Sequence, residues 1–435
     1  MHHHAHDPSR RSFLQACSVL GLAALGTQRG QAADGLDASL ARSGVTPLAD
    51  SPQWDRSLVL IELDGGNDGL NTIIPVDDPL YYEHRDERGV AISKGDALPI
   101  TGEELYRFHP SLGSQPSIWD AGDLAVVLGV GYERNNRSHF RGIDIWNTGS
   151  DADTFLDTGW LGRTLAGTPV PSDVVAEGTI LRRAGSSPLE HGAIRNLAIK
   201  DPEDFIKNGR DLVAIEPEQQ EAAAGRPGLQ HLLQVHEDVR LASGRFAEAL
   251  APVDDYAPPS YSTPFPNSGL GQQLQGVADM LISGLRIPVH KVSFNGFDTH
   301  ASQVDSNNNR RGRHADLMRE LDEAIAAFRA ACIEHNAWDR VTVMTYSEFG
   351  RRVKANASAG TDHGGASCHF FWGGGVQGGL YGSMPSLAEE QLIRGDLAAT
   401  TDFRRLYSSA LGWLGLDSSL TFGAESFTPL PVLGS

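Results

Sequence analysis

Carboxylate and imidazole side chains follow several apolar runs of the chain, at positions where a strand would end. Oxygen and imidazole ligands of this kind hold Zn, Mn and other divalent ions in proteins. Clustered carboxylates repel one another in a low-dielectric crevice unless a cation offsets their charge. For any one of these residues, a place in a turn or a helix cap is the better explanation, but several together favour a metal site. The expected ligands are Asp64, Asp298, His300, Glu348, Asp362 and His363, with Asp68 close by.

A candidate nucleophile lies in the segment 135–140, which reads Asn-Asn-Arg-Ser-His-Phe and follows the second apolar run. The segment is expected to open a helix, where backbone N–H groups bind an anion and a hydroxyl is well placed to attack. We therefore take Ser138 as the candidate nucleophile and Arg137, or else Arg141, as the clamp for an anionic group. Serine is also a common helix N-cap, which explains Ser138 equally well, and His139 would equally well face the core.

Four short apolar runs predict the buried strands that position these residues. They span 57–63, 124–130, 289–294 and 341–346. Between the last two runs, 316–335 has apolar residues at helical spacing. Strand, helix and strand in that order imply a parallel sheet, and ligands bind beyond the carboxyl ends of its strands. The predicted fold class is α/β, with a mostly parallel central sheet flanked by helices.

The segment from about 167 to 267 interrupts this alternation with Pro- and Gly-rich turns and a helical stretch near 229–250. We expect an inserted cap on the sheet, because the strands before and after it belong together. Residues 34–435 then form a single domain. The glycine-rich segment 370–379 lacks the Lys-Ser/Thr ending of a phosphate-binding loop, so we expect a strand and a turn beside the site.

The N-terminus has the features of a twin-arginine export signal. Arg10 and Arg11 precede Ser-Phe-Leu, a weakly apolar run covers 16–25, and small residues lead to a cleavage site near Ala33. The alternative is an ordinary amphipathic first helix. The apolar run is about half the ~20 residues that span a bilayer, so we expect a soluble or peripheral mature protein. Residues 1–33 would be removed after passage through the twin-arginine translocase, leaving a periplasmic or extracellular protein.

The composition limits the partners. A formal charge of −19 argues against nucleic acid and anionic membrane surfaces, because a polyanion would need a basic face. With 435 residues, of which 40% are hydrophobic, the chain can bury a large core. Three cysteines are present and Cys17 would leave with the signal, so a disulfide scaffold is excluded and only Cys332 and Cys368 remain to pair.

Several short motifs resemble the bacterial family called domain of unknown function 1501. This family is in turn similar to the alkaline phosphatase and sulfatase superfamily, which implies a three-layer sandwich, a hydroxyl nucleophile and a metal centre. By that resemblance Asp64 is the first metal ligand and Ser138 the nucleophile. Asp298 with His300, and Asp362 with His363, are the later ligand pairs. The motifs lie at 63–69, 137–140, 159–163, 297–300, 347–351 and 360–364.

The chain departs from the superfamily pattern in three ways. The Asp-His pair in mid-chain is spaced Asp-x-His, without the wider gap of the phosphatases. Glu348 stands where an Asp-His pair normally closes a strand, and Asp362 with His363 follows a loop later. The last metal histidine has no unique counterpart, with His314 and His369 as the alternatives.

The sequence therefore predicts an exported, metal-dependent hydrolase of phosphate or sulfate esters, acting on a small-molecule or glycan ester. One or two divalent ions, zinc, manganese or calcium, would activate Ser138 or a water and offset charge on the transferring group. The alternative is a non-catalytic envelope protein that keeps the fold and serves in binding or assembly. A carbohydrate-binding module would rest only on Trp160, Trp372 and Tyr381, and scattered aromatic residues are usually core.

Overall fold

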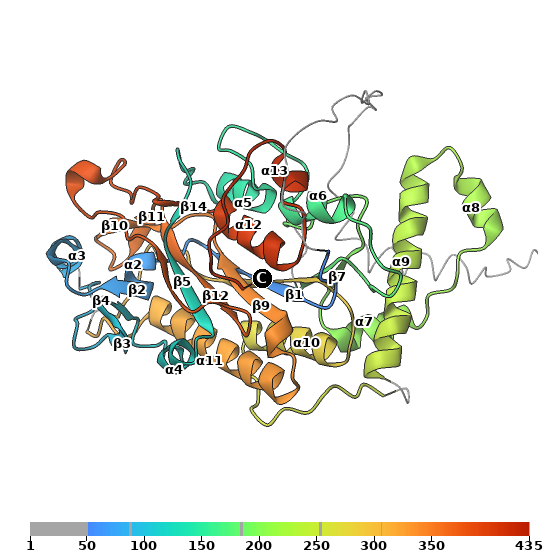
Figure 1. Ribbon diagram of the computed structural model, residues 1–435, viewed down its shortest axis with the longest axis horizontal. Coiled ribbons are helices and arrows are strands. Elements are labelled where there is room, and N and C mark those ends of the chain that lie inside the picture. Colours follow the sequence, from blue (N-terminus) through green and yellow to red (C-terminus); the bar gives the residue numbers. More distant parts are fainter. Residues whose placement is uncertain (1–50, 87–88, 183–185, 252–254, 306, 435) are drawn as a thin grey trace, which may run out of the picture.

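A nine-stranded sheet forms the centre of the computed structural model (Figure 1). Its strand order is β13-β5-β12-β9-β1-β8-β6-β7, with β14 also paired to β5. The structure describes residues 51–86, 89–182, 186–251, 255–305 and 307–434, and the signal expected at residues 1–33 lies outside them.

The four predicted strands form the middle of this sheet. β1 (Ser57–Asp64) lies between β8 (Val289–Asn295) and β9 (Val341–Tyr346) and is parallel to both. β5 (Leu124–Gly131) is separated from β9 by β12 (Ser367–Gly373), which is antiparallel to both neighbours. The predicted α/β class and mostly parallel sheet are confirmed. The remaining strands of the sheet, all parallel to their partners, are β6 (Gly178–Leu181), β7 (Asn196–Ile199), β13 (Gly379–Gly382) and β14 (Thr401–Asp402).

Successive residues of a strand point to opposite faces of the sheet, so both faces carry apolar side chains. Helices cover both faces. Ile61 of β1 enters the core on one face, together with α10 (Gly269–Ile282) and α11 (Arg313–Glu334). The helix predicted over 316–335 is α11. Its apolar residues Leu317, Leu321 and Phe328 are buried in that core.

The opposite face carries a second core. Leu60, the neighbour of Ile61, packs there with α5 (His139–Thr148), α6 (Trp160–Ala166) and α12 (Arg404–Trp413). Figure 1 shows the three layers, with α10 and α11 on one side of the strands and α5, α6 and α12 on the other.

The segment from about 167 to 267, expected to be an inserted cap, contributes partly to the central sheet and partly to a projection from the body. β6 and β7 lie within it and extend the parallel sheet beyond β8, so this part belongs to the sheet and not to a cap. α7 (Pro202–Gly209) follows, and then α8 (Pro217–Ala223) and α9 (Pro227–Leu250) project from the body (Figure 1). The buried residues of α9 all lie between Ala242 and Leu250, so its N-terminal part stands clear of the core.

Smaller elements complete the fold around the central sheet. β10 (Arg351–Ala355) follows β9 after a short loop and pairs antiparallel with β11 (Thr361–His363). The others are α2 (Gly69–Thr72), β2 (Ile73–Pro75), α3 (Pro79–Arg85), β3 (Leu98–Ile100), β4 (Glu103–Phe108), α4 (Gln115–Asp120), α13 (Ser419–Phe422) and two 3-10 turns, Trp338–Arg340 and Glu389–Gln391.

No helix in the described part of the chain combines the length and apolar composition needed to cross a membrane. Cys332 and Cys368 are both buried free thiols.

Candidate metal centre

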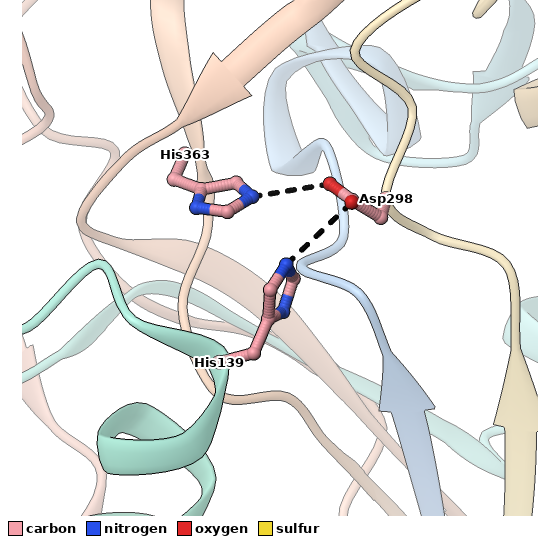
Figure 2. Close-up of side chains that lie close together, drawn as sticks. All are labelled: His139, Asp298 and His363. Carbon is pink, nitrogen blue, oxygen red and sulfur yellow. Dashed lines mark hydrogen bonds and ion pairs between the residues drawn. The ribbon is translucent and has the colours of Figure 1, made fainter.

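Two histidines and one aspartate converge beyond the carboxyl ends of the central strands. His139 is the first residue of α5, Asp298 lies in the loop after β8, and His363 ends β11. Figure 2 shows both rings turned toward the Asp298 carboxylate. Nε2 of His139 lies 3.6 Å from one carboxylate oxygen, and Nε2 of His363 lies 3.1 Å from the other. One ligand atom from each residue lies within 4.8 Å of the other two, a grouping that could hold a metal ion.

Hydrogen bonds on the far side of each ring fix which nitrogen faces the aspartate. Nδ1 of His363 lies 2.8 Å from the carbonyl oxygen of Arg137, and because a carbonyl only accepts, Nδ1 carries the proton. Nδ1 of His139 lies 2.7 Å from Oε1 of the buried Glu348. In a neutral ring, each Nε2 then presents a lone pair toward Asp298. A carboxylate or carbonyl behind each histidine is the usual arrangement in metal centres.

The charges of the three residues favour a bound cation. Partial burial lowers the pKa of His363, whereas the hydrogen bond with Glu348 raises the pKa of His139. Burial opposes ionisation of Asp298, but hydrogen bonds from Arg351 and His363 outweigh it, and its pKa lies below the usual range. Because Nδ1 of His363 already donates to the Arg137 carbonyl group, Nε2 can donate to Asp298 only when the ring is protonated. In the neutral ring, which burial favours, its lone pair faces the carboxylate oxygen at 3.1 Å. A divalent ion between them removes this repulsion, so the residues present fit such an ion.

The buried guanidinium group of Arg351 connects the loops that carry the site. Its Nη2 donates to Oδ1 of Asp298 at 2.8 Å. Nη2, Nε and Nη1 also bind main-chain carbonyl groups of the loop after β1, of the Asp298 loop and of β11. An arginine so completely surrounded by acceptors fixes the relative positions of all three segments. The carbonyl groups are those of Gly65, Gly66, Phe297 and Thr361.

Two glycines allow main chains to approach closely at the site. Gly65 has a φ of +124°, and a Cβ there would lie 2.2 Å from the main-chain nitrogen of Asp298. Only glycine fits this position. In α5, a Cβ on Gly142 would lie 3.0 Å from the carbonyl oxygen of Glu348. Because α5 packs this closely on the Glu348 loop, the His139 ring reaches the Glu348 carboxylate.

A buried polar network lies behind the cluster. Arg85 and Asp68 form an ion pair of 2.6 Å, with both side chains buried. Gln303 donates to Asp68 at 2.5 Å and accepts the hydroxyl groups of Thr299 at 3.0 Å and Thr361 at 2.6 Å. Thr299 follows Asp298 and Thr361 starts β11, so this network joins the two segments that carry ligands. Asp68 thus has a buried ion-pair partner and lies outside the cluster.

Three of the six expected ligands lie together. Asp298 and His363 belong to the cluster, and Nδ1 of His300 lies 2.7 Å from Oδ1 of Asp298. The ring centres of His300 and His363 are 4.5 Å apart. His300 is therefore beside the cluster, on its exposed side.

The other three expected ligands lie outside the cluster of three. Glu348 binds His139 from behind. Neighbouring residues of a strand face opposite ways, so Asp362 points away from the side of β11 that carries His363. Its carboxylate accepts a hydrogen bond of 3.0 Å from Asn356. Asp64 ends β1, where its carbonyl oxygen accepts the N–H groups of residues 296 and 297. His314 and His369, the alternatives for a last histidine, are both buried and are not members of the cluster.

Ser138 and Arg137 flank the cluster. Ser138 is the N-cap of α5, and its exposed side chain makes no cap hydrogen bond. Its main-chain N–H donates to Asn136 at 2.9 Å. The guanidinium group of Arg137 pairs with the buried Asp396, with Nε and Oδ2 3.1 Å apart. The hydroxyl group next to His139 is thus exposed, and the cation of Arg137 is held by Asp396.

A family model described as a protein of unknown function, DUF1501, matches residues 93–424. This range is well over half of the chain and includes the whole cluster. The chain belongs to the DUF1501 family. No curated protein matches this DUF1501 chain.

Three solved structures similar to this DUF1501 protein have TM-scores of 0.35 to 0.36. At these TM-scores the likeness carries no information on the chemistry of the site. They are a lipoteichoic acid synthase from Listeria monocytogenes (TM-score 0.35, 9% identity, covering 96% of this chain and 81% of that one), the PsFucS1 sulfatase from Pseudoalteromonas sp. (0.35, 9%, 97% and 77%) and a phosphonate monoester hydrolase of Agrobacterium radiobacter (0.36, 11%, 86% and 79%).

Two residues of this DUF1501 site were not assigned to it from the sequence. The sequence places His139 equally well at a site or in the core, and it indicates no role for Arg351. Both stand inside motifs that resemble the family, Arg-Ser-His-Phe at 137–140 and Ser-Glu-Phe-Gly-Arg at 347–351. Their place inside these motifs is therefore the feature of the sequence that could have indicated a role for both residues.

Proposed function

We propose that this protein holds a divalent cation between His139, Asp298 and His363 and hydrolyses phosphate or sulfate esters outside the cytoplasm. The proposal is carried by the orientation of the two rings. Hydrogen bonds at both Nδ1 atoms leave both Nε2 atoms facing one carboxylate. Among zinc, manganese and calcium, two imidazole ligands favour zinc, since calcium and manganese prefer oxygen ligands.

The surrounding residues supply what ester hydrolysis needs besides the ion. A bound cation would act as a Lewis acid and offset negative charge on the ester. The exposed hydroxyl group of Ser138 is the candidate attacking group, and it stands at the N-terminus of α5, where free N–H groups favour an anion. Arg351 holds Asp298 in its ionised form and in position. The substrate would be a small-molecule or glycan ester.

Location outside the cytoplasm rests on the twin-arginine signal at residues 9–14. The net charge of −19 is consistent with a protein that does not bind nucleic acid.

The test is elemental analysis of the protein purified after native export, with residues 1–33 absent, followed by turnover of para-nitrophenyl phosphate and para-nitrophenyl sulfate. We expect a stoichiometric metal and hydrolysis of at least one ester. The double variant His139→Ala and His363→Ala should lose the metal, and Asp362→Ala should keep it. A folded protein that binds no divalent ion would overturn the proposal, and metal without turnover would favour the binding or assembly role.

A further inference from the structure

Three arginines surround one buried carboxylate beside the candidate metal centre. The Asp396 side chain is 2% exposed, with Nε of Arg137 at 3.1 Å and Nε of Arg352 at 3.5 Å from its two oxygens. Arg394 contributes a third positive charge near it. Burial raises the pKa of Asp396, and the three guanidinium groups act against that shift. Three positive charges against one negative charge leave an excess of cations in a chain whose net charge is −19.

These arginines lie on the His363 side of the centre. The carbonyl group of Arg137 binds Nδ1 of His363 at 2.8 Å while its side chain binds Asp396. Arg352 follows Arg351 in β10, and Arg351 is the register partner of His363. The main chain next to Asp396 also contacts the segment after β11: the N–H group of Ala366 donates to the carbonyl group of Leu397 at 3.4 Å. The main chains that carry Arg137 and Arg352 therefore contact the segment of the ligand histidine, while their side chains meet at Asp396.

A tight turn presents Arg394. The main chains of Ile393 and Asp396 exchange two hydrogen bonds of 2.9 and 3.1 Å around Arg394 and Gly395. Both central residues have positive φ, +57° and +82°. Turns of this kind favour Asn or Asp followed by Gly, so an arginine at the first position is held in an unfavourable conformation. A Cβ on Gly395 would lie 3.8 Å from Cζ of Arg352, so the turn packs on that guanidinium group.

Most donors of these arginines remain available. Among the described residues, the Arg394 side chain has no hydrogen-bond partner, and it is exposed. Arg352 is 35% exposed and donates once, from Nη2 to the carbonyl group of Arg394 at 3.1 Å. Arg137 is 31% exposed. Each guanidinium group has five donors in a planar fork that matches phosphate and sulfate oxygens.

We propose that Arg137, Arg352 and Arg394 form a subsite for a second phosphate or sulfate group of the substrate, on the part that is not transferred. One arginine would suffice to neutralise Asp396, so pairing with that carboxylate does not account for the other two. The inference rests on the proposed function and narrows the substrate class to esters that carry at least two such anionic groups.

The test is calorimetric binding of two non-hydrolysable probes in the presence of zinc, methylphosphonate and a series of α,ω-alkyl bisphosphonates of increasing length. We expect one bisphosphonate to bind at least about tenfold more tightly than methylphosphonate, since a charge-assisted bidentate contact is strong. The double variant Arg352→Gln and Arg394→Gln should lose that preference. Arg226→Gln with Arg286→Gln, an exposed and a half-buried arginine outside the cluster, removes the same charge and should keep the preference.

The outcomes separate this inference from the proposed function. A wild-type protein without preference for any bisphosphonate, or a Gln variant that keeps the preference, overturns the subsite. The metal centre is tested separately, by whether His139→Ala loses methylphosphonate binding. That result does not affect the comparison of bisphosphonate binding between the wild type and the Gln variant. If the Gln variant fails to fold, Arg352→Lys with Arg394→Lys replaces it. The Lys variant keeps the charge but loses the fork, and we expect a reduced preference; an unchanged preference would overturn recognition by the guanidinium fork.

Discussion

Nδ1 of His139 lies 2.7 Å from Oε1 of Glu348, and this contact orients the ring whose other nitrogen faces Asp298. The same carboxylate oxygen accepts the main-chain N–H of Gly65 at 2.9 Å. One buried carboxylate therefore joins α5 to the loop after β1, and the position of His139 depends on it.

Glu348→Gln should weaken zinc binding by about 10- to 100-fold, because partners behind a ligating histidine commonly affect metal affinity to that extent. Competition with a fluorescent chelator measures the affinity. Asp362→Asn is the matched control and should bind zinc like the wild type, since Asp362 binds Asn356 outside the cluster. An unaltered affinity in Glu348→Gln would remove Glu348 from the support of the metal.

Ser138→Ala should lower turnover of the hydrolysed ester by at least about 100-fold while the metal content stays at the wild-type level. The reason is loss of the attacking hydroxyl group at the start of α5. Steady-state kinetics with elemental analysis of the same sample make the measurement, and Ser138→Thr, which keeps a hydroxyl, should retain more activity. Full turnover in Ser138→Ala would assign the attack to a water molecule and leave Ser138 as a helix cap.

Arg351→Met should reduce the free energy of unfolding by about 3 kcal/mol or more, because each buried acceptor left without a donor costs roughly 1–3 kcal/mol. The buried guanidinium group also satisfies several carbonyl groups, which the variant leaves without a donor. Urea denaturation measures the change. Arg319→Met removes an exposed ion pair with Asp316 and should cost less than about 1 kcal/mol. Equal losses in the two variants would show that Arg351 does not hold the loops.

Acid should destabilise the fold through two buried histidines. Burial lowers the pKa of His290 and of His369 to about 3, against 6.5 as the ordinary value. Above the ordinary value both states are neutral. Between the two values only the unfolded chain takes up the proton, so stability falls as the pH falls, by roughly 1.4 kcal/mol per pH unit for each histidine.

Urea midpoints across this pH range measure that slope. His369→Gln removes one of the two titrating groups, and its slope should be shallower than that of the wild type. The same slope in both proteins would contradict the assignment to His369.

The central strands were predictable from the sequence because each is buried on both faces. Residues 57–63 and 341–346 are nearly continuous apolar runs, typical of parallel strands between helical layers. β6 and β7 have four residues each, too few for periodicity to separate a strand from a turn-rich insertion. Their place in the sheet is decided by pairing with β8, which depends on the whole fold.

The site was predictable only in part, for similar reasons. Asp298 follows β8, so the convergence of the carboxyl ends of the parallel strands accounts for its place. His363 ends β11, which pairs with β10 in a separate two-stranded sheet. In β11, alternation allows either Asp362 or His363 to face the cluster, and the register with β10 decides between them. His139 reaches the site because Gly142 packs on the Glu348 loop, a contact between distant segments that no local pattern reveals.

The three cluster residues come from α5, the loop after β8 and β11, which only the central sheet brings together. A chain that has not yet formed this sheet offers isolated histidines, which bind divalent ions weakly. Selection among competing ions would then occur in whichever compartment the chain folds. Under the proposed export by the twin-arginine translocase that compartment is the cytoplasm, and the ion that this site would carry out would then reflect cytoplasmic rather than external metal concentrations.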